Sequence, residues 1–295
     1  MSGEASIDRV LALAAVPGLT DLHPDDLASL AERAEERRIA AGELAVPNDA
    51  REAVFLLAGA LGCDASPRPF AAPAPVGVVE ALEGVELPLR ALGDGAHLLA
   101  VPREPLRRVI GDIFELWLAV MRHTAERLLA VEPREIEAVE LEHRLQLGDS
   151  EVPLTTRIHL LAGCELLHGQ RAYALGRLAA EMEELELRAG ATLWEPGANP
   201  DAAFLLVDGR VAIPARDDGA AAEHGPGAML GLRELLAAAP HEGRVEVATD
   251  ARVLRLPRET LIDELEDDPD MAAALLDGLA RRTLRAESAA NVRAR

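Results

Sequence analysis

The sequence contains no lysine, so all 30 of its basic residues are arginines. Acidic residues number 51, which leaves a formal net charge of -21. Such a surface repels phosphate backbones and anionic lipids and attracts a basic partner. The charge therefore predicts a protein partner, one with a basic surface, and argues against nucleic acid and membrane.

Aromatic residues and cysteines are also scarce. Aromatics make up 2% of the chain, so the cores must be aliphatic, and Cys63 and Cys164 are the only cysteines. Two cysteines suit a reducing compartment. No apolar run approaches membrane-spanning length, and the start "MSGEASIDRV" lacks the basic and apolar regions of a signal peptide. We expect a cytoplasmic protein.

Catalytic and metal-binding motifs are missing as well. The chain has no G-x-S-x-G, no G-K-[ST] after a glycine loop and no H-E-x-x-H. Cys164 and His168 are spaced i, i+4 with His159 nearby, but a zinc site needs three or four ligands in a recognised pattern. We therefore predict a non-enzymatic protein without metal or cofactor, in which Cys164 is buried beside a surface histidine.

An internal repeat is the most informative feature that is present. The segment "ERRIAAGELAVPNDAREAVFLLAGALG" (36–62) aligns with "ELELRAGATLWEPGANPDAAFLLVDGRVA" (184–212), which places Gly42 on Gly190 and Gly59 on Gly209. Further on, "LLAVPREPLRRVI" (98–110) aligns with "VLRLPRETLIDEL" (253–265). The order is kept while loop lengths drift, as in a duplicated domain.

Each copy reads as a helix, a set of short strands and a second helix. The segment 23–39 has Asp25 and Asp26 in its first turn and an apolar stripe, which predicts an amphipathic helix. Short apolar runs closed by glycine predict paired strands. Pro102 and Pro257 stand where a strand should give way to a helix.

The helix after Pro102 should be long, because apolar residues recur at helical spacing until Pro133 breaks it. These residues are Ile110, Phe114, Trp117, Met121 and Leu128. Phe114 and Trp117 could face a partner, but we favour packing within the chain. We expect helix to resume over 134–147, which gives a first domain over 1–130, a helical linker over 131–153 and a second domain over 154–290.

The repeat resembles the cyclic-nucleotide-binding domain family, shared by catabolite-activator-type regulators and regulatory subunits of cyclic-AMP-dependent kinase. The resemblance is best over 157–285, through "LRAGATLWEPGANPDAAFLLVDGRVAI", the turn "HGPGAMLGLRELL" and "ATDARVLRLPRE". The first copy, about 9–130, is a weaker match. The resemblance implies a mainly β fold with helices (α+β): two jelly-roll-type barrels in tandem, each flanked by helices.

The resemblance also implies where a ligand would bind. In ligand-binding members a Gly-Glu pair opens a short helix, and the Glu holds the ribose hydroxyl. An Arg a few residues later pairs with the cyclic phosphate. In the second copy the glycine is Gly231, but the Glu position is Leu232 and the Arg position falls on His241. Both ligand-holding side chains are therefore missing there.

In the first copy the Glu position is Val78 and the Arg position falls near Val85, with Pro88 nearby. Loss of one charge-assisted contact costs about 1.5–3 kcal/mol. Loss of two would weaken micromolar binding to roughly millimolar. We therefore predict that neither copy binds cyclic nucleotide.

A shifted loop would change this prediction for the second copy. Arg233, Glu234 and Arg244 lie close to the expected positions, so Glu234 and Arg244 could rebuild a site around Gly231 and His241. Against this, Glu246 would repel a phosphate. The alternative function is a sensor that binds a cyclic nucleotide or another anion through these residues of the second domain.

The leading hypothesis is a regulatory or scaffold protein that uses its domains for protein-protein interaction. Tail residues at helical spacing are candidates for a homodimer or partner seam, namely Met271, Leu275, Leu279 and Leu284. Asp270 is expected to cap the tail helix. We expect no helix-turn-helix after the second domain, which makes a transcription regulator the third choice.

Overall fold

The computed structural model describes residues 2–46, 51–63, 69–132, 136–138, 151–213 and 221–293. The chain divides into two compact units, residues 1–124 together with 280–295, and residues 125–279. No helix among the described residues is both long enough and apolar enough to cross a membrane. Each unit is described by itself below.

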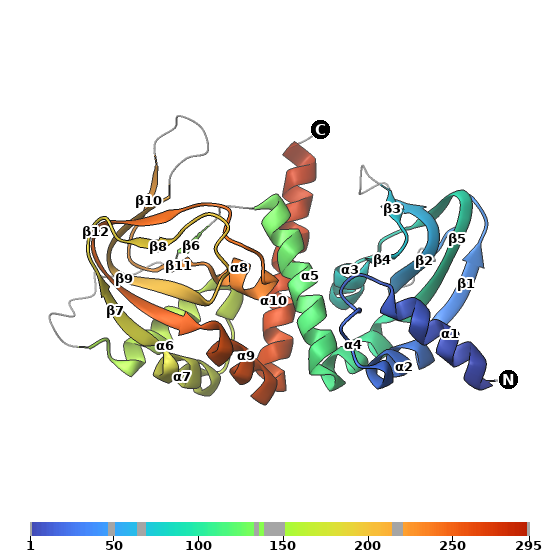
Figure 1. The fold of residues 1–295 in the computed structure, drawn as a ribbon, viewed down its shortest axis with the longest axis horizontal. Helices are drawn as coiled ribbons and strands as arrows, with labels where there is room; N and C mark the ends of the chain where they lie inside the picture. Colours follow the sequence, from blue (N-terminus) through green and yellow to red (C-terminus); the bar gives the residue numbers. More distant parts are fainter. Residues whose placement is uncertain are drawn as a thin grey trace. The chain divides into compact units, whose positions relative to one another are not determined.

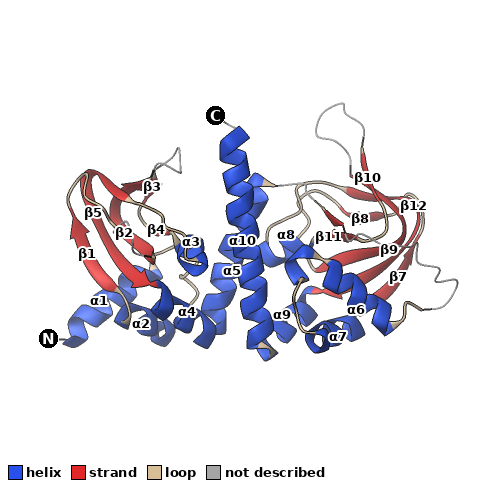
Figure 2. Cartoon of the chain, turned by 180° about the vertical axis from the view of Figure 1, so that it is seen from behind, coloured by secondary structure: helices blue, strands red, loops and turns tan. Residues whose placement is uncertain are grey.

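The first unit combines one antiparallel sheet with helices (Figure 1). Its elements are α1 (Ser2–Ala14), α2 (Pro24–Glu32), β1 (Glu35–Ile39), β2 (Glu52–Gly62), β3 (Phe70–Ala71), β4 (Ala74–Val76), α3 (Val78–Glu83), β5 (Arg90–Pro102), α4 (Arg103–Asp112) and the start of α5 (Phe114–Val131). Helices α1, α2 and α4 lie together at one end of this sheet (Figure 2).

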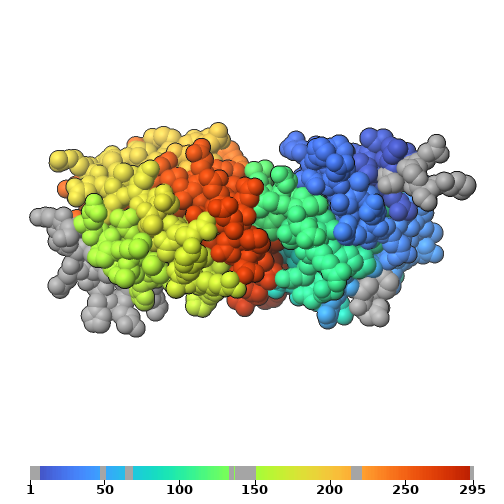
Figure 3. All heavy atoms as spheres, turned by 90° about the horizontal axis from the view of Figure 1, so that it is seen from below, coloured from blue at the N-terminus to red at the C-terminus, as the bar shows by residue number. Residues whose placement is uncertain are grey.

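The second unit repeats this plan. Its elements are β6 (Glu137–Ala138), α6 (Leu154–Gly163), the 3-10 turn η1 (Glu165–Leu167), α7 (Ala172–Glu181), β7 (Glu183–Leu187), β8 (Thr192–Trp194), β9 (Ala202–Ile213), β10 (Ala222–His224), β11 (Ala228–Leu230), α8 (Leu232–Ala237), β12 (Val245–Pro257), α9 (Arg258–Asp267) and the start of α10 (Pro269–Arg293). Helices α6 and α7 belong to the lime-to-yellow surface that this unit presents when it is seen from below (Figure 3).

The strands of the two sheets pair in the same way. β1 pairs with β5, β5 with β2, and β2 with both β3 and β4; likewise β7 pairs with β12, β12 with β9, and β9 with both β10 and β11. All of these pairs are antiparallel. The α+β fold expected from the sequence is therefore confirmed, with one antiparallel sheet and attached helices in each unit.

The aligned glycines have equivalent backbone conformations and contacts in both units. Gly59 and Gly209 adopt φ values of 86° and 88°, where a side chain would collide with the carbonyl oxygens of Gly95 and Asp250 respectively. Gly42 donates from its N–H to Ala91 at 2.8 Å, and Gly190 donates to Val247 at 2.8 Å. The glycine pattern of the sequence thus marks equivalent backbone positions.

The two prolines begin helices as predicted. Pro102 and Pro257 are the N-cap residues of α4 and α9, and their ψ values of 152° and 144° turn strand into helix. The prediction of one long helix after Pro102 is wrong in one respect. The helix is interrupted at Ile113, whose extended φ and ψ of -125° and 102° separate α4 from α5.

The predicted helix over 23–39 is too long. Helix α2 ends at Glu32, and Glu35–Ile39 form β1, whose backbone pairs with β5. The predicted apolar stripe of this helix is confirmed, since Leu27 and Leu30 are buried. Pairing along the sheet edge overrides the helical propensity of the charged residues that follow.

The predicted helical linker over 131–153 lies mostly outside the described residues. Residues 133–135, including Pro133, and residues 139–150 are not described. Of the helix expected over 134–147, the described residues 137 and 138 instead form strand β6, which pairs with β11.

Three of the four side chains proposed for a dimer seam are buried within the chain itself. Met271, Leu275 and Leu279 on α10 are all buried within the chain. Leu284 is half-buried. The helical spacing of these residues therefore reflects packing of the chain's own core, and the seam prediction is wrong for the three buried residues. Helix α10 is capped by Asp268, which accepts from Met271 N–H at 3.0 Å, whereas Asp270 pairs with Arg171.

Phe114 and Trp117 pack within the chain, as favoured. Their rings stack with centroids 5.3 Å apart, and Trp117 is buried. Elsewhere the cores are mainly aliphatic, as the scarcity of aromatics predicted, although Phe204 belongs to the core of the second sheet. The first sheet buries Val54, Leu56, Leu61 and Leu98.

Candidate functional site

A cavity lies beside the glycine turn of the second unit. Gly231 adopts φ 77° and leads from β11 into α8. The cavity has a volume of about 50 Å³, which is room for a few water molecules. Its lining residues are Ile136, Trp194, Ile213, Met229, Leu230, Gly231, Leu232, Arg233, Glu234, His241, Glu242, Gly243 and Val245.

Two aromatic rings fill much of the space next to Gly231. The His241 ring stacks on Trp194, with centroids 4.1 Å apart and an angle of 11° between the planes. Trp194 is fixed because its Nε1 donates to the carbonyl of Gly243 at 3.0 Å. A side chain at 231 would come within 3.4 Å of both rings. The positive φ of Gly231 is therefore what favours glycine, while both rings lie at ordinary contact distance from this position.

His241 is a neutral, buried base. His241 is 4% exposed, and its Nδ1 has no hydrogen-bond partner among the described residues. Burial lowers the pKa of His241 to about 4, although the nearby carboxylate of Asp201 opposes the shift. At neutral pH this position therefore carries no positive charge toward the cavity.

Leu232 and Arg233 open helix α8. Leu232, at the position predicted for the ribose carboxylate, is a buried apolar residue. The guanidinium of Arg233 is 6% exposed, donates to the carbonyl of Glu132 at 2.9 Å and lies 3.7 Å from the Glu132 carboxylate. The cation of Arg233 is thus already paired with this acid.

Glu234 adds a carboxyl group to the cavity wall. Burial raises the pKa of Glu234 above its usual value, against opposing contributions from its own backbone N–H and from Arg233. The carboxylate of Glu242, also in the wall, contributes to the increase. Two acidic residues therefore line a space where an anion was the expected ligand.

Arg244 does not join Glu234. Its guanidinium lies 2.7 Å from Glu246 and 3.4 Å from Glu195, and it donates to Thr192 at 3.1 Å. The side chain is 43% exposed and does not line the cavity. The structure thus brings together Gly231, Arg233, Glu234 and His241, and it places Arg244 in a separate surface cluster.

Trp194 and Glu242 were not singled out from the sequence, although both line the cavity. Trp194 belongs to β8, and the turn at Gly231 lies 37 positions later, so local spacing gave no reason to connect the two. One signal was available: Trp194 is one of two tryptophans in a chain with few aromatics.

The first unit has the equivalent turn. Gly77 adopts φ 72° and begins α3 with Val78, which is buried. A side chain at 77 would lie 3.5 Å from Leu87, ten residues later, the same interval that separates Gly231 from His241. Val85, suggested for the phosphate position, is 45% exposed, and Leu87 occupies the contact instead.

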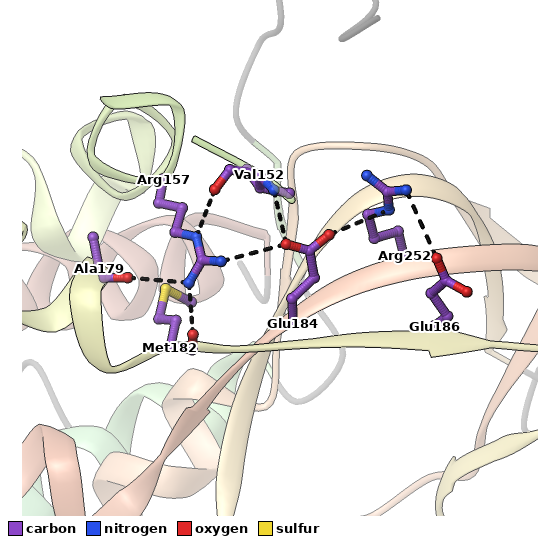
Figure 4. Close-up of polar contacts among 7 residues, drawn as sticks. All are labelled: Val152, Arg157, Ala179, Met182, Glu184, Glu186 and Arg252. Carbon is purple, nitrogen blue, oxygen red and sulfur yellow. Dashed lines mark hydrogen bonds and ion pairs between the residues drawn. The ribbon is translucent and has the colours of Figure 1, made fainter. Parts of the chain in front are cut away.

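An ion-pair network connects helices and strands of the second unit (Figure 4). Arg157 on α6 donates to the carbonyls of Val152 at 2.9 Å and Met182 at 2.6 Å, and it pairs with Glu184 at 3.3 Å. Glu184 also accepts from Val152 N–H at 2.8 Å and lies 3.4 Å from Arg252 on β12. The network joins the segment just before α6 to the end of α7 and to strands β7 and β12.

The histidines near Cys164 stay apart from it. Cys164 is buried and its thiol donates to the carbonyl of Leu160 at 3.4 Å, while His159 and His168 are exposed. Among the residues that the structure describes, no group of three or more His, Cys, Asp or Glu is placed to hold a metal ion.

Comparisons with known proteins agree with this architecture. The cyclic nucleotide-binding domain model matches residues 184–268. A CRP-like cAMP-activated global transcriptional regulator of Mycobacterium tuberculosis is 24% identical over 130 residues, which cover 43% of this chain and 58% of that protein. The present chain thus matches little more than half the length of this curated relative.

Solved structures with a similar chain include two from different organisms. The regulatory domain of Toxoplasma gondii PKA with cAMP is 15% identical, with 91% of this chain and 95% of that chain covered and a TM-score of 0.34. The N-terminal domain of a transcriptional regulator from Streptomyces coelicolor A3(2) is 27% identical, with coverage of 44% and 93% and a TM-score of 0.41. From the sheet, the glycine turn and the family match together, we conclude that residues 184–268 form a domain of the cyclic nucleotide-binding family.

Proposed function

We propose that this is a non-enzymatic regulatory protein whose two units are tandem copies of the cyclic-nucleotide-binding fold. In this proposal neither copy binds cyclic nucleotide, and both act through protein-protein interaction. The single observation that carries it is the stacked pair of Trp194 and His241 beside Gly231, where a ligand would have to lie.

The charges around the cavity support the same proposal. Leu232 and His241 stand at the positions where the family resemblance expects a carboxylate and a guanidinium. Arg233 is paired with Glu132, while Glu234 and Glu242 face the cavity. A cyclic phosphate would meet two acids and a neutral imidazole, and it would have to displace the stacked rings.

The proposed partner is a protein with a basic surface. The chain carries a formal charge of -21, which raises the rate of encounter with a positive surface and makes that rate sensitive to salt.

A calorimetric titration with cyclic AMP, cyclic GMP and cyclic di-GMP tests the proposed loss of binding. We expect no saturable heat at millimolar nucleotide for the natural protein. Micromolar binding of any of the three nucleotides would contradict the proposal.

The matched gain-of-function variant is Leu232→Glu combined with His241→Arg. It restores both side-chain types that the family resemblance expects, each worth about 1.5–3 kcal/mol. We expect cyclic AMP affinity to rise by at least about 100-fold. A folded double variant that gains nothing would show that these two positions do not account for the loss.

A further inference from the structure

The cavity beside Gly231 contains a buried polar atom whose partner is missing. The Nδ1 of His241 belongs to a side chain that is more than nine-tenths buried, and no described group bonds to it. Buried polar atoms almost always have a partner, and an exception in a cavity wall marks a place where a molecule can bind. A neutral imidazole offers one lone pair, which accepts from an N–H donor.

The acids in the cavity wall favour the same kind of ligand. Glu234 and Glu242 line the cavity together with His241. Arg233, the one arginine among the described lining residues, lies 3.7 Å from Glu132 and also interacts electrostatically with Glu234. These two carboxylates carry one more charge than the guanidinium, and the charge of -21 on the whole chain attracts cations.

The remaining walls set the size and shape of the ligand. Ile136, Ile213 and Met229 are apolar, and Trp194 presents an indole. The volume of about 50 Å³ admits only a few heavy atoms. Indole rings attract cations that have lost part of their hydration shell.

We propose that the second unit binds a small organic cation, a protonated amine or amidine head group, whose N–H groups donate to Glu234 and to Nδ1 of His241. This inference rests on the proposed loss of cyclic nucleotide binding, because both ligands would compete for the same space. It adds that this pocket binds a cation, whereas the family resemblance implies an anionic ligand at the same place.

Three probes of nearly equal size and shape separate charge from fit: acetamidinium chloride, acetamide and sodium acetate, at matched ionic strength. Binding is followed through the indole N–H signals of the two tryptophans in ¹H–¹⁵N correlation spectra of the full chain. Trp194 lines the cavity, while Trp117 is buried elsewhere and serves as the internal reference.

We expect acetamidinium to shift the Trp194 signal saturably, with a Kd on the order of 1 mM for so few atoms. Acetamide should bind about tenfold more weakly, and acetate should not saturate. The proposal is overturned if acetamidinium gives no saturable shift below about 20 mM, or if acetate matches it.

Two variants test the assigned groups. Glu234→Gln keeps the shape and removes the charge, and His241→Phe keeps a stacked ring and removes Nδ1. Each should weaken acetamidinium binding by about tenfold. Glu223→Gln, an exposed residue that does not line the cavity, is the control and should bind like the natural protein.

Folding of the second unit is checked for each variant by the dispersed backbone amide signals of that unit in the same spectra. If both cavity variants fold and keep full affinity, the assignment is wrong. Cyclic AMP added to the same natural sample tests the proposed function separately. A shift with cyclic AMP contradicts the loss of nucleotide binding, whereas a null result with acetamidinium contradicts only the cation site.

Discussion

His241 shows how burial sets the charge of a single side chain. The residue stacks on Trp194 and is 4% exposed, and burial lowers its pKa to about 4 from an ordinary 6.5. Between these values the unfolded chain binds a proton that the folded chain does not. Stability must therefore decrease as the pH falls from about 6.5 to about 4.

We predict that His241→Phe removes part of this acid sensitivity. The lost protonation is worth up to about 3 kcal/mol in unfolding free energy between pH 6.5 and 4. Urea unfolding is followed through Trp194 fluorescence in a Trp117→Phe background, at both pH values. An equal loss of stability with and without His241 would show that its imidazole is not buried in the neutral form.

Glycines with the same φ differ in what surrounds them. Gly209 and Gly190 have φ values of 88° and 86°, but a side chain at 209 meets Asp250 backbone while one at 190 meets nothing within 4 Å. We predict that Gly209→Ala costs about 4 kcal/mol of unfolding free energy and Gly190→Ala about 1 kcal/mol. Chemical denaturation measures both, and equal costs would contradict the close approach at Gly209.

At the scale of elements, the Arg157 network ties helices to strands. Its guanidinium is 12% exposed and Glu184 is 16% exposed, so the pair is largely shielded from water. Breaking it leaves Glu184 with fewer partners and leaves the carbonyls of Val152 and Met182 without this donor.

We predict that Arg157→Ala lowers the unfolding free energy of the second unit by about 3 kcal/mol. The matched control is Arg210→Ala, whose partner Glu223 is an exposed acid, and it should change stability by less than about 0.5 kcal/mol. Urea denaturation compares the two. Similar small losses would mean that the network does not hold α6 to β7.

At the scale of the whole molecule, the apolar positions of α10 belong to the fold. Leu275 is fully buried, whereas Val292 on the same helix is 74% exposed. A dimer seam and a core would give the same spacing in the sequence, but only the core buries these residues within one chain.

We predict that Leu275→Ala lowers the unfolding free energy by about 2–5 kcal/mol and leaves the oligomeric state unchanged. Val292→Ala should alter neither property. Denaturation and sedimentation equilibrium provide the two readouts, and a change of mass in the Leu275→Ala variant with little loss of stability would restore the seam.

The sequence by itself determined the repeated glycines, the prolines that begin α4 and α9, and the mainly aliphatic cores. It also places Leu232 and His241 where the family resemblance expects a carboxylate and a guanidinium. These features are local, because each depends on the backbone preference or chemistry of one residue and its near neighbours. The cyclic nucleotide-binding domain model matches residues 184–268, which agrees with the family resemblance of the second copy.

Only the tertiary structure decided which side chains pack beside the Gly231 turn and which acids pair with Arg233 and Arg244. Trp194 contacts His241 from a strand 47 positions earlier in the sequence. Arg233 pairs with Glu132, 101 positions away, and Arg244 pairs with Glu195 and Glu246 and does not line the cavity. Residues 35–39 became a strand because β5 was there to pair with them. Such contacts depend on chain segments that folding brings together, and no local pattern of the sequence specifies them.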